Sequence, residues 1–150
     1  MNQTSHYLPL LLLLALSTSG CLWERPESSY SSFADAKLKG AVDKGWIPAW
    51  LPASTTDIRE LHDIDTNESM LAFNLDPKQG WPLPDHCQSV TYEETSPPRF
   101  SRRWWPSAQQ LEQSYDFYRC KADVPFSATL TWVGQHKSGE RGIHWRAHAR

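Results

Sequence analysis

Five residues of two chemical types lie close together in the chain and could bind a ligand. They are the arginines and tryptophans of the segment RFSRRWWP: Arg99, Arg102, Arg103, Trp104 and Trp105. Arginine donates paired hydrogen bonds to phosphate or carboxylate groups, and an indole ring offers a flat face to cations or sugar rings. The segment is predicted to be a loop, which suits a binding site. The alternative is that one tryptophan packs into the core while the arginines stay in water.

The other reactive side chains form no recognisable catalytic or metal-binding pattern. The segment from Asp63 begins like a calcium loop, but its sixth and twelfth positions are Glu68 and Asn74 where Gly and Glu are required. His144 and His148 lack a third ligand nearby in the sequence, and zinc prefers three or four. The chain has neither a G-x-S-x-G motif nor a glycine-rich phosphate loop. We therefore expect no catalytic residue, no metal and no cofactor.

Cys21 ends the most apolar part of the chain. It follows an apolar run of about ten residues and the small residues 17–20, which is the length of a signal-peptide core and too short for a membrane helix. The segment Thr18-Ser19-Gly20-Cys21 resembles the lipobox of bacterial lipoproteins. The resemblance implies cleavage of a signal peptide over residues 1–20 and attachment of lipid to Cys21. Leu22, where Asp would signal inner-membrane retention, implies the outer membrane. An ordinary secretory signal is the alternative.

The remaining two cysteines are Cys87 and Cys120. An odd number of cysteines in an exported protein needs an explanation, and a lipid on Cys21 would leave an even pair. Exported proteins fold in an oxidising compartment, so we predict a Cys87–Cys120 disulfide. Two buried free thiols are the alternative.

Size and charge restrict the class of protein. About 130 residues would remain after cleavage, enough for one domain with its own core. The net charge of −2 is too small to indicate a nucleic-acid partner. Residues 21–98 carry a net charge of −7 and residues 99–150 of +5. Either the second half forms a basic face toward an anionic surface, or the two halves neutralise each other in the fold.

The pattern of apolar residues and turn signals predicts the local structure. Residues 21–32 are predicted to be a tether, and residues 33–150 a single globular domain. Helices are expected at about 33–44, 55–63 and 107–114, with Ser32 and Ser107 as N-caps. Strands are expected at 70–75, 88–93 and 115–120. A β-hairpin is predicted from the alternation of SATLTWV and RGIHWRA on either side of Gly139.

These elements predict an α+β fold, with an antiparallel sheet of about four or five strands, two or three short helices and one disulfide. The segment GWIPAWLPASTTDIRELHDIDTN is also similar to segments of small uncharacterised bacterial lipoproteins. That resemblance covers roughly 25 to 40 residues. It implies a location in the bacterial envelope and brings no known activity with it.

The expected function is that of a membrane-anchored envelope lipoprotein facing the periplasm, a non-catalytic binding or structural module. The membrane is the first partner, through the lipid, and peptidoglycan, lipopolysaccharide or an envelope protein is the second. A cell-wall or lipid-directed hydrolase is one alternative, which a pocket that gathers His62, His86 or His136 with a carboxylate would indicate. An accessory subunit of an envelope assembly is the other, and a large exposed apolar patch would indicate it.

Overall fold

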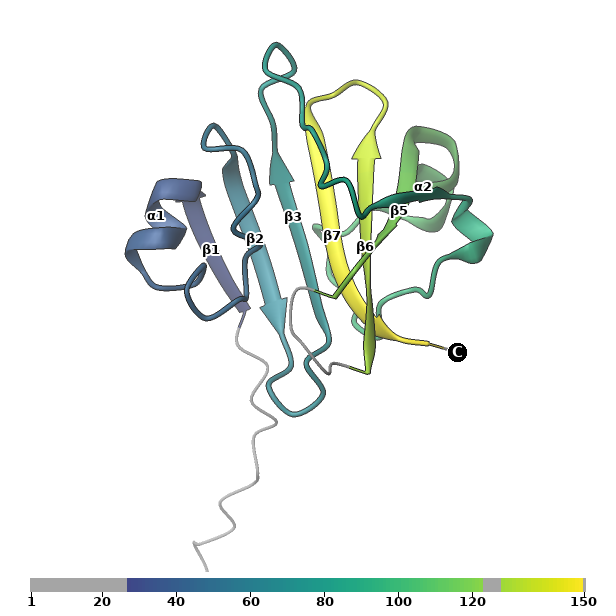
Figure 1. Cartoon of the computed structure of the whole chain (residues 1–150), viewed down its shortest axis with the longest axis horizontal. Coiled ribbons are helices and arrows are strands. Elements are labelled where there is room, and N and C mark those ends of the chain that lie inside the picture. Colours follow the sequence, from purple (N-terminus) through teal and green to yellow (C-terminus); the bar gives the residue numbers. More distant parts are fainter. Residues whose placement is uncertain (1–26, 123–127, 150) are drawn as a thin grey trace, which may run out of the picture.

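The computed structural model describes residues 27–122 and 128–149, and these form one seven-stranded antiparallel sheet (Figure 1). The strand order is β1-β2-β3-β7-β6-β5-β4. The elements, in chain order, are β1 Glu27–Ser32, α1 Phe33–Leu38, β2 Thr56–His62, β3 Ser69–Asn74, β4 Gln88–Val90, the 3-10 turn η1 Tyr92–Glu94, α2 Ala108–Ser114, β5 Tyr115–Cys120, β6 Thr129–His136 and β7 Arg141–His148. Within these residues no helix is both long and apolar enough to cross a bilayer.

The α+β prediction with four or five strands is wrong, because the protein is mostly antiparallel β-structure. The main error concerns residues 55–63, where Ile58 and Leu61 suggested one side of a helix. These residues form β2 instead, which pairs with β1 on one side and β3 on the other. Ile58 and Leu61 therefore lie on opposite faces of the sheet and are both fully buried, in separate clusters.

The N-terminal boundary of the domain also differs from the prediction. Residues 27–32, expected in the tether, form the edge strand β1, with Tyr30 opposite Ile58. The helix expected at 33–44 ends at Leu38, because Gly40 takes a left-handed backbone with φ 74°. The amide of Gly40 then donates to the carbonyl of Lys37, and the amide of Ala41 donates to that of Ala36, the pattern of a Schellman C-cap.

Several local predictions are confirmed. Ser32 and Ser107 cap α1 and α2 through bonds from the amides of Asp35 and Gln110. Strands form where the sequence predicts them at 70–75 and 115–120, and the hairpin is β6 and β7. The strand predicted at 88–93 is shorter, because η1 begins at Tyr92.

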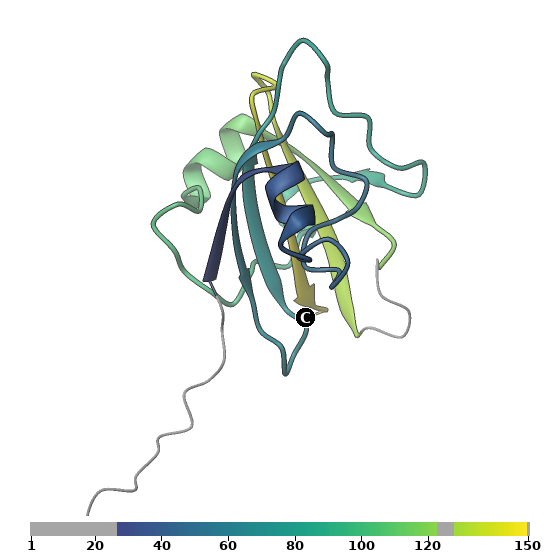
Figure 2. The same ribbon diagram turned by 90° about the vertical axis from the view of Figure 1, so that its left-hand side faces the viewer.

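Each face of the sheet is covered by a different part of the chain (Figure 2). Helix α1 and residues 39–55 pack on one face, which we call the α1 face; its core includes Ile47, Leu71 and Val133. Helix α2 and the loop before it pack on the other, which we call the α2 face; its core includes Trp132 and Trp145. Because the central strands are buried on both faces, the polar residues that alternate with apolar ones in β7, His144 and Arg146, are buried as well.

Candidate functional site

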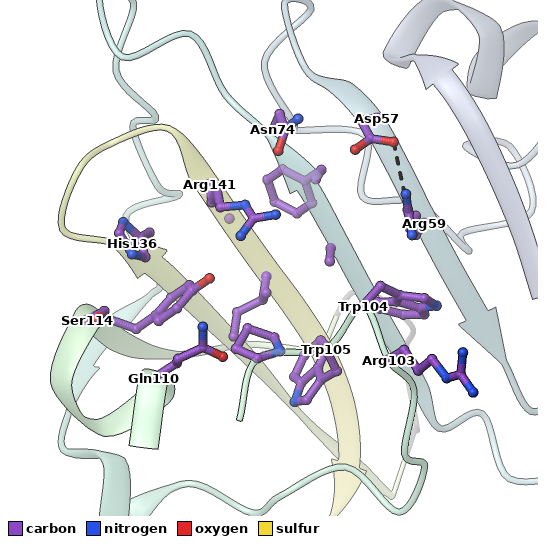
Figure 3. Close-up of a pocket in the computed structure, with 16 residues that line it drawn as sticks. Asp57, Arg59, Asn74, Arg103, Trp104, Trp105, Gln110, Ser114, His136 and Arg141 are labelled. Carbon is purple, nitrogen blue, oxygen red and sulfur yellow. Dashed lines mark ion pairs between the residues drawn. The ribbon is translucent and has the colours of Figure 1, made fainter. Parts of the chain in front are cut away.

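A pocket of about 300 Å³ opens on the α2 face, between the loop before α2 and the strands β2, β3 and β7 (Figure 3). Ala72 and Ile143 lie in its floor, and the exposed arginines Arg59, Arg103 and Arg141 lie around it. The lining also includes Asp57, Asn74, Trp104, Trp105, Tyr115 and His136. The volume is at the lower end of the range for small-molecule sites.

The structure divides the five predicted binding residues into two groups. Arg103, Trp104 and Trp105 line the pocket. Arg99 and Arg102 do not line it and instead pair with carboxylates: Arg99 Nη1 lies 3.2 Å from Glu68 Oε2, and Arg102 Nε lies 2.7 Å from Glu27 Oε2. The predicted loop is therefore part of the pocket, but two of its three arginines hold the loop in place.

Glu27 on β1 fixes the wall of the pocket. Its Oε1 accepts a hydrogen bond of 2.9 Å from Trp104 Nε1, while its Oε2 binds Arg102. The hydrogen bonds from Trp104 and then Arg102 lower the pKa of Glu27, so the carboxylate form is favoured. The indole of Trp104 is thus held in one orientation before any ligand arrives.

Trp105 contributes mainly to the core. Its ring packs edge-to-face against Trp145, with 5.7 Å between ring centroids, and meets Trp104 at 6.1 Å. Trp105 therefore packs against the core, as one interpretation of the loop predicts, and Trp104 stands in the pocket wall, where ligand binding stays a prediction. A double replacement of the two tryptophans would disturb the core as well as the pocket.

The contact between Glu27 and the loop gives a first prediction. In a Glu27→Ala variant, amide hydrogens of residues 101–105 are expected to exchange about tenfold faster, because charge-assisted hydrogen bonds each contribute roughly 1.5–3 kcal/mol. Hydrogen exchange followed by mass spectrometry measures this. Asp116→Ala, at an exposed position of β5, serves as the control. Unchanged exchange in the loop would show that Glu27 does not hold it.

Most of the polar lining comes from strands and was missed by sequence reasoning. Asn74 and Arg141 are neighbours in the register of β3 and β7, and Arg59 stands opposite Ala72. Arg59 falls in a segment that the sequence predicts to be helical, so nothing relates it to the loop, which begins 40 positions later in the chain. A pairing of the predicted strands could have brought Asn74 and Arg141 together, but their register is set by contacts distant in sequence.

The backbone of β2 is irregular beside the pocket. The register against β3 shifts between Thr56 and Arg59, and Asp57 has a positive φ of 47°. Bulges are enriched near binding sites because they change the direction of side chains. Asp57 Oδ1 lies 3.8 Å from Arg59 Nε, and both side chains are at least half exposed, so this ion pair is weak.

Positive charge dominates the pocket. Three guanidinium groups line it together with one carboxylate, that of Asp57. Within the described residues, Arg141 and Arg103 form no ion pair with a carboxylate. Burial raises the pKa of Tyr115, and the charge of Arg141 opposes this rise, which indicates that the two groups interact electrostatically. The chemistry of this lining favours an anion.

A second cluster of ionisable groups lies on the α1 face and is buried. Glu60 and His62 on β2 and Arg146 on β7 are at most 5% exposed, and Trp46 stacks on His62 at 5.6 Å. Arg146 Nη2 donates hydrogen bonds to His62 Nδ1, at 3.2 Å, and to the carbonyl oxygen of Gly45, at 3.3 Å. Burial raises the pKa of Glu60 to about 8, and burial together with Arg146 lowers that of His62 to about 4. Near pH 7 the side chains of Glu60 and His62 are therefore both uncharged.

The predicted disulfide is confirmed: Cys87 and Cys120 are bonded, with 4.0 Å between their Cα atoms. His86 Nδ1 lies 3.9 Å from Cys87 Sγ, so His86 and the two cysteines are close enough to share a metal ion. In the disulfide form, however, neither sulfur is a thiolate, the form that binds metals. Cys21, the predicted lipid site, lies outside the described residues.

Comparison with known proteins relates one part of the chain to a family. Residues 24–74 match the YbbD head domain, which covers about a third of the chain and points to a small bacterial family. The match includes β1, α1, β2 and β3, and the GWIPAWLPAS segment. No curated protein and no solved structure matches the chain. The pocket lies where the matched segment meets the rest of the sheet, because Arg59 and Asn74 come from the matched residues and Trp104 and Arg141 do not.

Proposed function

We propose that this chain is a lipid-anchored bacterial envelope protein whose α2-face pocket binds an envelope component without transforming it. The observation that carries the binding function is the pocket itself, which combines three arginines with the oriented indole of Trp104. Such a combination of cationic side chains and an aromatic face in an open hollow is typical of ligand recognition.

The anchor is proposed from the lipobox-like segment. Cys21 precedes Glu27 by six residues, and an extended chain spans at most about 3.5 Å per residue, so β1 begins within about 20 Å of the lipid. Because Glu27 also holds Trp104, the wall of the pocket stays within that reach of the bilayer surface. This short reach supports the proposal that the ligand is an envelope component. The proposed location of the chain is the outer membrane, facing the periplasm.

The arrangement of the histidines supports binding rather than hydrolysis. His136 and Asp57 both line the pocket, but they lie on opposite sides of it (Figure 3). Asp57 pairs with Arg59, and His136 Nδ1 is hydrogen-bonded to Ser138 Oγ at 2.8 Å. His62 is close to Glu60, at 3.9 Å, but both are buried. A general base needs a reachable proton on a substrate, and neither pair offers this geometry.

The exposed apolar surface gives little support to a structural subunit. Of the described residues, the large apolar side chains that are exposed are Leu38 and Ile64. Leu38 ends α1 and Ile64 lies in the turn between β2 and β3, so they are single residues on separate elements. Isolated apolar residues are normal on a monomer surface.

The proposal predicts that membrane attachment and envelope binding can be lost separately. A Cys21→Ser variant is expected to move from the membrane fraction to the soluble fraction, because it lacks the acyl chains that supply the proposed anchor. The intact mass of the parent should show the lipid and cleavage before Cys21. If Cys21→Ser stays with membranes as the parent does, the anchor is wrong.

The binding half is tested with the soluble Cys21→Ser chain and isolated cell envelopes. Adding Trp104→Ala is expected to reduce retention at least tenfold, whereas adding Trp46→Ala, a half-buried tryptophan on the α1 face, should not. Thermal unfolding of each variant checks that the fold persists. Equal retention of the Trp104→Ala and Trp46→Ala variants would reject the pocket as the binding site.

A further inference from the structure

We infer that the α2-face pocket recognises a phosphorylated sugar, with Arg59 and Arg141 on the phosphate and Trp104 against the sugar ring. This inference rests on the proposed binding function and names the class of ligand.

Arg59 and Arg141 can reach one anion from two sides. Arg59 is opposite Ala72 on β3, Ala72 is opposite Ile143 on β7, and Arg141 is two residues from Ile143 on the same face. The two arginines are therefore two strands apart, about 10 Å across the sheet, and one side-chain pair apart along it. Long side chains that start at this separation can converge over the small residue between them. Figure 3 shows both guanidinium groups beside the hollow, with Arg103 extending away from Arg141.

A phosphate fits this arrangement better than a carboxylate. A carboxylate is planar and is satisfied by one guanidinium in a bidentate pair. A phosphate monoester carries close to two negative charges at neutral pH and has three oxygens that accept hydrogen bonds in different directions. Two arginines on opposite sides match that distribution. Asn74, between Asp57 and Arg141 in Figure 3, adds an amide donor at the same edge.

The rest of the pocket suits one sugar ring. Its volume of about 300 Å³ leaves room for a ring beside the phosphate, but not for a long enclosed chain. The indole of Trp104 is held by Glu27 and stands in the wall, so its face is prepared for the C–H side of a ring. Ala72 keeps the floor low, since a larger residue there would fill the hollow. A rigid wall and floor reduce the entropy lost on binding.

Phosphorylated sugars have two sources in an envelope: soluble sugar phosphates and the headgroups of phosphorylated glycolipids. The same contacts would recognise both. The test therefore uses glucosamine 1-phosphate as the soluble probe. Phosphatidylethanolamine vesicles with and without lipid A serve as the membrane probe.

Binding of the soluble Cys21→Ser chain is measured by isothermal titration calorimetry for the soluble probes and by vesicle co-sedimentation for the lipid. We expect one or both phosphorylated sugars to bind. Inorganic phosphate should bind at least tenfold more weakly than the phosphorylated sugar, and glucosamine and glucuronate should bind at least tenfold more weakly still or not at all. Binding only to vesicles with lipid A assigns the glycolipid source, and binding only to glucosamine 1-phosphate assigns the soluble source.

Three variants locate the site. Arg141→Gln is expected to weaken binding at least thirtyfold, because it removes the positive charge that pairs with the phosphate. The glutamine amide keeps the side chain polar, so the change is conservative for the fold. Ala72→Leu should block the pocket to a similar extent without changing any charge. Arg119→Gln, an exposed arginine on β5 outside the pocket lining, is the matched control and should bind as the parent does. Circular dichroism confirms that each variant is folded, and if Arg141→Gln fails to fold, Ala72→Leu decides.

The results distinguish this inference from the proposed function. If glucuronate binds as tightly as the phosphorylated sugar, or if Arg141→Gln and Arg119→Gln bind equally, the ligand class is wrong. If no phosphorylated sugar binds while envelopes still retain the chain through Trp104, the inference fails and the binding function stands. If envelopes do not retain the chain either, both fail.

Discussion

A Glu60→Gln variant is expected to gain about 2 to 3 kcal/mol of unfolding free energy relative to the parent chain when the pH rises from 5.5 to 7.5. The sign follows from the pKa of Glu60, which is about 8 in the folded chain against an ordinary value of 4.5. Between these two values the unfolded carboxyl loses its proton while the folded one keeps it. The unfolded state therefore binds fewer protons, and the parent becomes less stable as the pH rises. Glutamine does not titrate, so the variant lacks this loss.

The physical cause is burial without compensation. Glu60 is 0% exposed, and neither of its oxygens accepts a hydrogen bond from the described residues. The guanidinium of Arg146 favours the carboxylate, but burial outweighs it. The same face also holds His62 and His144, and Asp63 lies next to His62 in the chain. The pKa of His62, about 4, makes the chain more stable as the pH rises from about 4 to 6.5. That contribution is common to parent and variant and cancels in their difference.

Urea unfolding at pH 5.5 and 7.5 measures the effect. Glu112→Gln, at an exposed position of α2, controls for the loss of a carboxylate as such, and its stability should follow that of the parent. If Glu60→Gln and the parent change in parallel with pH, Glu60 is ionised in the folded chain. The buried cluster would then hold a carboxylate at neutral pH.

Replacing both Cys87 and Cys120 by alanine is expected to lower the unfolding free energy by about 4 kcal/mol. The disulfide joins residues separated by 33 positions, and closing a loop of that length in the unfolded chain accounts for most of this amount. The location increases its importance. β4 has only three residues and pairs with β5 alone. The disulfide at Cys87, directly before the N-terminal end of β4, therefore holds this edge strand on the sheet.

Urea unfolding under non-reducing conditions tests this prediction. The reduced parent is the matched control, and it should unfold at the same urea concentration as the double alanine variant. Neither cysteine and no residue of β4 lines the pocket, so ligand binding by the folded variant should be unchanged. A loss below about 1 kcal/mol would mean that the noncovalent pairing of β4 and β5 is sufficient.

The parts of the fold that could be predicted depend on neighbours in sequence. The β6–β7 hairpin, the cap of α2 by Ser107 and the strand after it follow from alternation and turn chemistry within short segments. The disulfide follows from the number of cysteines. β1 and β2 could not be predicted this way, because a serine-rich edge strand and a strand with a buried Glu60 have no apolar alternation. Their conformation is decided by pairing with each other and with β3.

The candidate site was predictable to a similar extent. The composition of the loop identified Trp104 and Arg103, because two residue types suited to binding lie together there. It could not separate them from Arg99 and Arg102, whose partners Glu68 and Glu27 are more than 30 positions away. The strand arginines Arg59 and Arg141 join the pocket only through the order of strands in the sheet, which no local pattern specifies.

The sheet order has a consequence for the segment that matches the YbbD head domain. That segment ends with β3, whose six residues pair with β7 along their whole length. A fragment cut after residue 74 would leave the inner side of β3 as an open edge, with Met70, Leu71 and Phe73 uncovered. Unpaired apolar edges of this kind recruit further strands and lead to aggregation. In this protein the family-matched segment therefore depends on the C-terminal hairpin for its solubility.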